Sequence, residues 1–195
     1  MDEQFWNDLY LEKPRLWSGA PNGMLVAEVA DLPPGQALDL GCGEGGDAIW
    51  LADRGWLVTA VDLSRVALER AAAAAGDAKI SWTHADMITN APPAASFDLV
   101  SAIYFPLKRQ DDHRALHGLL AAVAPGGTLL VGGHDQRDHD HHDPRFDPAE
   151  YYSPGEIADL LGDGWTIETN ETRPRVPLPP DAIHHADVVL RARRR

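Results

Sequence analysis

The residues best suited to holding a ligand are an aspartate and a series of glycines that follow a short apolar stretch. Residues 37–40 read Ala-Leu-Asp-Leu, and they are followed directly by Gly41, Gly43, Gly45 and Gly46. Glycines let the chain turn tightly and let a ligand approach the backbone. Amide groups at the start of a following helix favour negative charge. This segment is therefore the first candidate for a cofactor site.

Two cofactor patterns fit the glycine-rich segment. Gly41, Gly43 and Gly46 satisfy G-x-G-x-x-G, the pattern typical of dinucleotide-binding proteins. Asp39 and the glycines that follow it satisfy D-x-G-x-G-x-G, which resembles the S-adenosylmethionine (SAM) motif. Asp62 ends the next apolar stretch, where a carboxylate can accept both ribose hydroxyls in either case. The glycines alone leave both cofactors open.

Other positions favour the SAM pattern. Asp39 suits the cationic amino group of a methionine moiety and would repel a pyrophosphate. The sequence His-Ala-Asp-Met at 84–87 places an acid and an apolar residue where SAM methyltransferases contact adenine. The sequences Phe-Asp-Leu-Val at 97–100 and Ala-Pro-Gly-Gly-Thr-Leu-Leu at 124–130 resemble later strands of that family.

Together these motifs make residues 17–193 resemble the Rossmann-like SAM-dependent methyltransferases, and more narrowly the small tellurite-resistance-type group. The resemblance implies a Rossmann-like three-layer α/β sandwich, with a mostly parallel seven-stranded sheet whose last strand is antiparallel. It also implies SAM as cofactor and S-adenosylhomocysteine as product. The residues expected to bind the cofactor are Trp17, Asp39, Gly41, Cys42, Gly43, Gly45, Asp62, Leu63, Asp86, Met87 and Ile103.

Each of these assignments has a structural alternative. Asp39 could cap the next helix, Asp62 could be a turn residue and Asp86 could be solvated. Cys42 suits a small filler of the loop better than a nucleophile, and Ile103 suits either the adenine pocket or the core. Trp17 and Asn22 resemble family residues that close over the cofactor, but a Trp packed on a connecting loop fits as well.

Histidine is the expected general base, because it exchanges protons near neutral pH. Ligands of open α/β sheets bind beyond the carboxyl ends of the strands. His134, His184 and His185 fall there and are predicted to be catalytic, with His113 as a further candidate. A surface or structural role is the alternative for each. Arg173 and Arg175 are possible partners for an anionic substrate.

The segment 134–148 is rich in histidine and aspartate. A divalent metal could bind there, but the spacing matches no established ligand pattern, so we predict a solvated acidic loop and no metal. The residues concerned are Asp138, His139, Asp140, His141, His142 and Asp143.

The elements that would position these residues alternate in type. Short apolar runs predict strands, and apolar residues at helical spacing predict helices between them, which favours a parallel sheet covered on both faces. The last two strands are expected to pair antiparallel. The predicted strands are 36–40, 57–61, 79–84, 97–103, 128–132, 165–172 and 186–192. The predicted helices are 2–11, 24–30, 47–54, one capped by Ser64, 110–123 and one that starts with Ser-Pro-Gly-Glu at 153–156.

Length and composition fit one globular domain. The 195 residues are 44% apolar and are expected to form a single methyltransferase domain, with residues 1–34 as a helical lead-in. Seventeen basic and thirty acidic residues give a net charge of −13, which argues against nucleic-acid binding. One cysteine, no signal peptide and no membrane-length apolar run predict a cytoplasmic protein.

The function expected from these features is transfer of a methyl group from SAM to a small-molecule acceptor at oxygen, nitrogen, sulfur or a metalloid. A non-catalytic SAM-binding protein and an NAD(P)-dependent oxidoreductase are the alternatives. The sequence predicts neither the acceptor nor the oligomeric state.

Overall fold

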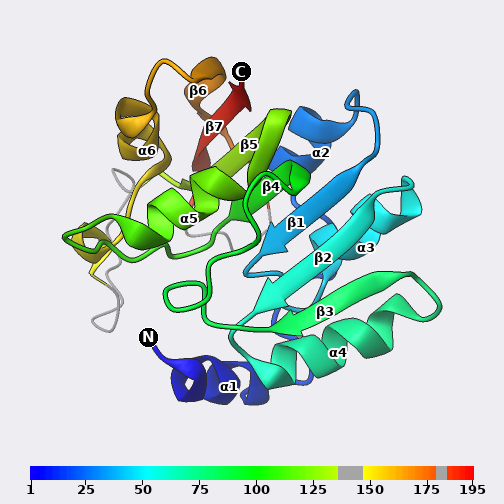
Figure 1. Ribbon diagram of the computed structural model, residues 1–195. Coiled ribbons are helices and arrows are strands. Elements are labelled where there is room, and N and C mark those ends of the chain that lie inside the picture. Colours follow the sequence, from blue (N-terminus) through cyan, green and yellow to red (C-terminus); the bar gives the residue numbers. More distant parts are fainter. Residues whose placement is uncertain (136–146, 179–183) are drawn as a thin grey trace.

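A single seven-stranded sheet organises the molecule, here in a computed structural model that describes residues 1–135, 147–178 and 184–195. Its order is β3-β2-β1-β4-β5-β7-β6, with β3 and β6 at opposite edges (Figure 1). The strands are β1 (Gln36–Leu40), β2 (Leu57–Asp62), β3 (Ile80–His84), β4 (Phe97–Ile103), β5 (Val123–His134), β6 (Trp165–Pro174) and β7 (Ala186–Arg194).

Strand directions confirm the predicted mostly parallel sheet. Strands β1 to β5 pair parallel with one another, whereas β7 runs antiparallel to both β5 and β6. Residues 175–185 join β6 to β7, and they are fewer than the dozen or so residues that a parallel crossover needs. The reversal of the last strand brings the start of β7 to the carboxyl ends of β4 and β5.

Helices cover the two faces of the sheet, and strand residues alternate between them as the two-residue period requires. Ala37 belongs to a core cluster with α2 (Gly23–Val29), α3 (Gly46–Asp53) and α4 (Arg65–Ala75). Leu38 belongs to the cluster of the other face, with α5 (Arg114–Ala122) and α6 (Pro154–Leu160). Helix α1 (Glu3–Leu11) packs on α4 (Figure 1).

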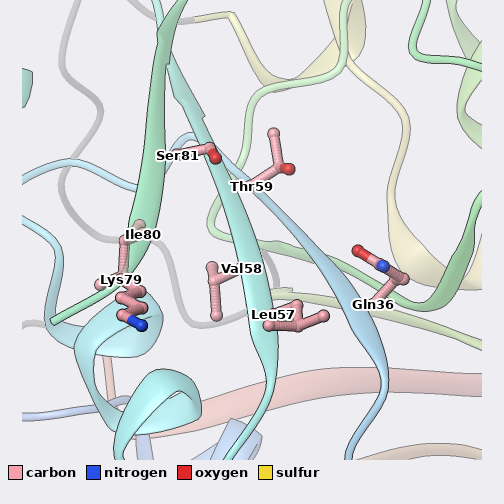
Figure 2. Close-up of a pocket in the computed structure, with 7 residues that line it drawn as sticks. All are labelled: Gln36, Leu57, Val58, Thr59, Lys79, Ile80 and Ser81. Carbon is pink, nitrogen blue, oxygen red and sulfur yellow. The ribbon is translucent and has the colours of Figure 1, made fainter.

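The sheet is not covered on both faces along its whole width, contrary to the prediction. The chain between β3 and β4, residues 85–96, forms turns rather than a helix. The face that Leu57 shares with Thr59 and Ser81 therefore carries a shallow pocket, and Leu57 stays 58% exposed (Figure 2). This pocket lies at the amino ends of β1 and β2, away from the glycine-rich segment.

Element boundaries follow local capping. The predicted start of α6 is confirmed, because Ser153 and Glu156 form a reciprocal capping box with Pro154 in the first turn. The predicted start of the helix at 110 is wrong. The backbone of His113 is left-handed (φ 51°), so α5 begins only at Arg114. Strand β5 is longer at both ends than the predicted 128–132.

Among the described residues, no helix combines the length and apolar character that a membrane span requires. A short 3-10 helix, η2 (Pro148–Glu150), leads into α6.

Candidate functional site

The glycine-rich loop joins β1 to α3 in a conformation that only glycine adopts easily. Gly41 and Gly43 have φ angles of 68° and 52°. A Cβ on Gly41 would lie 2.8 Å from the Phe105 ring, and one on Gly43 would lie 2.8 Å from the Tyr10 hydroxyl. The loop thus lies under Phe105 on one side and the N-terminal helix on the other. The positions that side chains on these two glycines would occupy are therefore already filled by Phe105 and Tyr10.

Three carboxylates are buried around this loop. Asp39 in β1 is 3% exposed, Asp47 in the first turn of α3 is 7% exposed, and Asp62 at the end of β2 is 8% exposed. Burial raises the pKa of all three carboxyl groups, and the charges of Asp47 and Asp62 raise the pKa of Asp39 further. The three acids thus lie close together, and no Lys or Arg of the described ranges forms an ion pair with them, although the charge of His84 lowers the pKa of Asp62.

Two of these carboxylates hold the backbone around them. Asp62 accepts hydrogen bonds from the amides of Gly43 and Ser64, both at 2.8 Å. Asp47 accepts from the amide and the side chain of Asn22, at 2.6 and 2.9 Å. The third carboxylate differs, because Oδ2 of Asp39 is buried and has no donor among the described residues.

An unsatisfied buried acceptor is the feature that fits SAM. The cofactor carries an ammonium group, which would donate to Asp39 and offset the local negative charge. A carboxylate has about four lone-pair positions, so Asp62 can bind loop amides and still accept from ribose hydroxyls. A pyrophosphate, in contrast, would add negative charge to three buried carboxylates. The residues present fit SAM and disfavour a dinucleotide.

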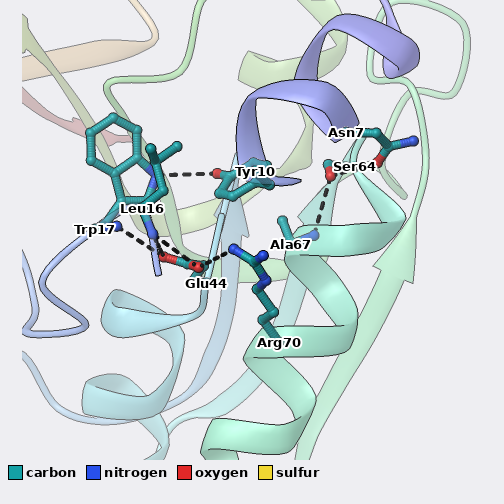
Figure 3. Close-up of polar contacts among 8 residues, drawn as sticks. All are labelled: Asn7, Tyr10, Leu16, Trp17, Glu44, Ser64, Ala67 and Arg70. Carbon is teal, nitrogen blue, oxygen red and sulfur yellow. Dashed lines mark hydrogen bonds and ion pairs between the residues drawn. The ribbon is translucent and has the colours of Figure 1, made fainter. Parts of the chain in front are cut away.

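The N-terminal segment is tied to the glycine loop through Glu44, which sequence analysis did not single out. Its carboxylate, 5% exposed, accepts from the amides of Leu16 (3.0 Å) and Trp17 (2.9 Å) and pairs with Arg70 of α4 at 3.0 Å (Figure 3). The Trp17 indole donates to the Tyr10 hydroxyl at 3.3 Å. This arrangement places Trp17 beside the loop, with its side chain largely exposed. The signal in the sequence that could have identified Glu44 is a single acidic residue between the glycines of the loop.

The other residues expected to contact the cofactor occupy varied surroundings. The buried Cys42 thiol has a raised pKa, caused by burial and then by Asp39, so it is a neutral filler rather than a nucleophile. The Asp86 carboxylate accepts from the Ile88 amide at 2.8 Å. Ile103 is buried in the core beside α2. The Leu63 carbonyl contacts the His84 ring, and Met87 packs on the opposite core cluster.

A second polar cluster lies beyond the carboxyl ends of β4 and β5, and it includes two of the predicted histidines. His134 ends β5, and its ring stacks on His184 with centroids 4.1 Å apart. The Tyr104 ring lies 4.3 Å away on His134 as well. Asp187 of β7 accepts from the Tyr104 hydroxyl at 2.9 Å, and its carboxylate lies 3.4 Å from Nδ1 of His134.

The three buried carboxylates and the cluster around His134 are neighbours in the structure. Asp47 contributes to the raised pKa of Tyr104, whose main causes are burial and Asp187. The chain after β6 also approaches α2, because a Cβ on Gly23 would meet the Val176 carbonyl. Gly23 follows the Asn22 that Asp47 holds. The histidine cluster therefore flanks the acidic cofactor site.

The remaining candidate residues lie in different places, and only one of them joins the His134 cluster. The His185 side chain is exposed, and its carbonyl accepts from the Arg175 amide at 2.8 Å. His113 contacts the Tyr152 hydroxyl between α5 and α6 rather than the His134 cluster. Arg173 pairs with Glu28 of α2 at 2.6 Å, whereas the Arg175 guanidinium lies 5.5 Å from the centre of the Tyr104 ring. Of the two arginines, Arg175 is the one at the site.

Sequence analysis missed two acids of the site besides Glu44. Asp47 and Asp187 are charged residues inside elements that were otherwise predicted to be apolar, which was the available signal. No cluster of metal-ligating side chains occurs in the described parts of the chain. The His and Asp residues at 138–143 lie outside the described residues.

Comparison with known proteins agrees with this geometry. Residues 37–127 match a family described as "Methyltransferase domain". An uncharacterized methyltransferase of Mycobacterium tuberculosis is 44% identical over 94 residues, which are 48% of each chain. A trans-aconitate 2-methyltransferase of Sinorhizobium fredii is 34% identical over 121 residues, or 60% of this chain and 46% of that protein. The chain spans about half the length of the curated relatives it matches.

The fold also matches solved structures along nearly the whole chain. The N-methyltransferase NodS of Bradyrhizobium japonicum, solved with S-adenosylhomocysteine, superposes with a TM-score of 0.75 at 18% identity, covering 98% of this chain and 97% of that one. Over residues 37–127 the chain is therefore similar to methyltransferases, and its overall fold is the Rossmann-like fold of the class I SAM-dependent methyltransferases.

Proposed function

We propose that this chain is an enzyme that transfers the methyl group of SAM to a small-molecule acceptor. The observation that carries the proposal is the buried Asp39 carboxylate, whose Oδ2 lacks a donor among the described residues. It stands in β1, directly before the glycine-rich loop. A cationic amino acid moiety would donate a hydrogen bond to this oxygen and offset its charge.

The chain's own residues have distinct tasks in this proposal. When bound, SAM supplies a methyl carbon that its sulfonium has already activated. Asp39 binds the ammonium group, and Asp62 binds the ribose while it keeps the loop amides in place. Glu44 holds the N-terminal segment over the loop, which limits the access of water. Alignment of the acceptor and removal of its proton then remain.

We assign proton removal to His134. It is the last residue of β5, half-buried, and its ring stacks against those of Tyr104 and His184. SAM held by Asp39 and Asp62 would supply the methyl group, and S-adenosylhomocysteine would be the product. The acceptor's proton passes to Nε2 of His134 and from there to solvent. His184 supports the ring by stacking, and the exposed His185 is less suited to the step.

The acceptor is proposed to carry an anionic group. Arg175 lies over the Tyr104 ring, which also contacts His134, so its guanidinium belongs to the same cluster. A guanidinium binds a carboxylate with two parallel hydrogen bonds. The trans-aconitate 2-methyltransferase among the relatives is named for an acceptor of this kind, which supports testing carboxylic acids first.

Turnover is the test of this proposal. The purified chain is incubated with SAM and a panel of carboxylic acids, phenols, amines and thiols, and formation of S-adenosylhomocysteine is followed. We expect turnover with at least one acid, reduced about 10²-fold or more in His134→Gln. His117→Gln is the matched control, because His117 is exposed on α5. SAM binding without turnover across the panel contradicts the enzymatic assignment and favours a non-catalytic SAM-binding protein.

A further inference from the structure

Asp187 is a buried carboxylate without a role in the proposed function. It lies near the start of β7, 5% exposed, opposite His134 in the register of β5 and β7. The residue opposite it on β6 is Arg173, but that guanidinium pairs with Glu28. No Lys or Arg of the described ranges lies within ion-pair distance of Asp187. Its partners are instead a phenol and an imidazole.

Both partners approach the same carboxylate oxygen. The Tyr104 hydroxyl donates to Oδ1 at 2.9 Å, and Nδ1 of His134 lies 3.4 Å from Oδ1. A carboxylate is only an acceptor, so the hydrogen of a neutral His134 must be on Nδ1 for this contact to be favourable. The lone pair is then on Nε2, the nitrogen farther from Asp187. A base needs that lone pair.

Tyr104 is fixed in a conformation that needs support. Its backbone is left-handed, with φ 54°, which is unusual for an aromatic residue. Its amide donates to the Gly132 carbonyl at 2.8 Å, and its hydroxyl is held by Asp187. The ring therefore stands against one face of His134 while His184 stands against the other. Rotation of the imidazole is restricted on both sides.

We propose that Asp187 is a positioning residue for methyl transfer, which holds His134 in the Nδ1–H form and Tyr104 against its ring. The role in transfer rests on the proposed function. The state of the imidazole does not, because it belongs to the protein alone. The groups that face His134 are Tyr104 from the end of β4, Asp187 from β7 and His184 from the segment before β7. Arg175 and Asp47 act instead on the pKa of Tyr104, the former lowering and the latter raising it.

The tautomer of His134 can be measured directly. In ¹⁵N-labelled protein, long-range nitrogen–proton spectra distinguish Nδ1–H from Nε2–H imidazole, and His134→Gln assigns the signal. We expect Nδ1–H in the wild type at a pH where His134 is neutral. In Asp187→Asn the amide can donate to Nδ1, so the signal should move toward the Nε2–H form. Asp163→Asn, an exposed aspartate before β6, should leave the signal unchanged.

Tyr104→Phe separates the two partners of Asp187. It removes the phenol but leaves the carboxylate, so the Nδ1–H form should persist. With an accepted acceptor, Asp187→Asn should lower kcat about 10²-fold at an unchanged KM for SAM. It should add nothing further in a His134→Gln background, since residues that act as a unit are not additive.

Each result decides the proposal. An Nε2–H signal in the wild type overturns it even if Asp187→Asn fails to fold. An unchanged signal in a folded Asp187→Asn overturns it too, as does an unchanged kcat. A tautomer change in a protein that shows no turnover supports the positioning of His134 and contradicts only the proposed function.

Discussion

Glu44 connects the N-terminal segment to the cofactor loop, and its replacement gives a prediction that can be worked out quantitatively. Glu44→Gln keeps one side-chain acceptor oxygen but removes the negative charge. The charged carboxylate accepts hydrogen bonds from the Leu16 and Trp17 amides and pairs with Arg70. A hydrogen bond to a charged group contributes about 1.5–3 kcal/mol and a neutral one about 0.5–1.5 kcal/mol. Because Arg70 is partly exposed, its ion pair contributes little. Summed over the three contacts, we expect a loss of about 2 kcal/mol in the free energy that holds the N-terminal segment against the glycine loop.

Such a loss corresponds to an about 30-fold larger population of the undocked segment. Hydrogen exchange followed by NMR measures it. The amides of Leu16 and Trp17 should exchange about 30-fold faster, because Glu44 accepts from both, and those of Val100 and Leu130 in the central strands should not change. Glu69→Gln, an exposed neighbour of Arg70, is the matched control. Unchanged exchange at Leu16 and Trp17, or faster exchange throughout the sheet, would refute the assignment of Glu44 as a local tie.

Four further predictions concern the acidic site, the glycine loop and the ion pairs of Glu28. The pKa values of Asp39, Asp47 and Asp62 are raised in the folded state, so the ligand-free protein binds extra protons and should gain stability as the pH falls through the raised values toward about 4. A cationic ligand favours the ionised acids, so SAM should bind more weakly over the same range with proton release on binding, measured by calorimetry in two buffers; a pH-independent affinity contradicts this. Gly43→Ala forces a side chain onto a left-handed residue and against Tyr10, and it should cost about 1–2 kcal/mol in unfolding free energy, while Gly162→Ala, which meets no neighbour, should not. Glu28→Ala should destabilise the protein by about 1–2 kcal/mol, because Arg173 and Arg191 lose their buried partner but keep Glu171 and Glu168; thermal melting tests it, and an unchanged melting temperature counts against it.

Sequence reasoning was most successful where local chemistry decides the structure. The capping box of Ser153 and Glu156 fixes the start of α6, and it is readable as a four-residue pattern. The alternation of apolar strands and helices in the sequence was enough to predict the parallel part of the sheet. The short link between β6 and β7 determined the reversed last strand. These features depend on neighbours in the sequence.

Some of the missed features are local backbone conformations, and the others depend on distant contacts. The late start of α5 follows from the left-handed His113, and the bare face of β2 and β3 follows from the short crossover at 85–96. Asp187 and Tyr104 are 83 positions apart and meet only because β7 enters the sheet beside β5. Glu44 reaches back to Leu16 and Trp17 across the loop. No periodicity or spacing in the sequence reports such pairs.

The central claim is that the glycine loop and its carboxylates hold SAM, and calorimetric titration of the protein tests it most directly. SAM, S-adenosylhomocysteine, NAD and NADP are titrated into the wild type, Asp39→Asn and Asp53→Asn, the last being an exposed aspartate at the end of α3. We predict binding of SAM and S-adenosylhomocysteine but of neither dinucleotide, about 10- to 100-fold weaker in Asp39→Asn and unchanged in Asp53→Asn. Binding of NAD or NADP in place of SAM, or equal SAM affinity in the wild type and Asp39→Asn, would contradict the account.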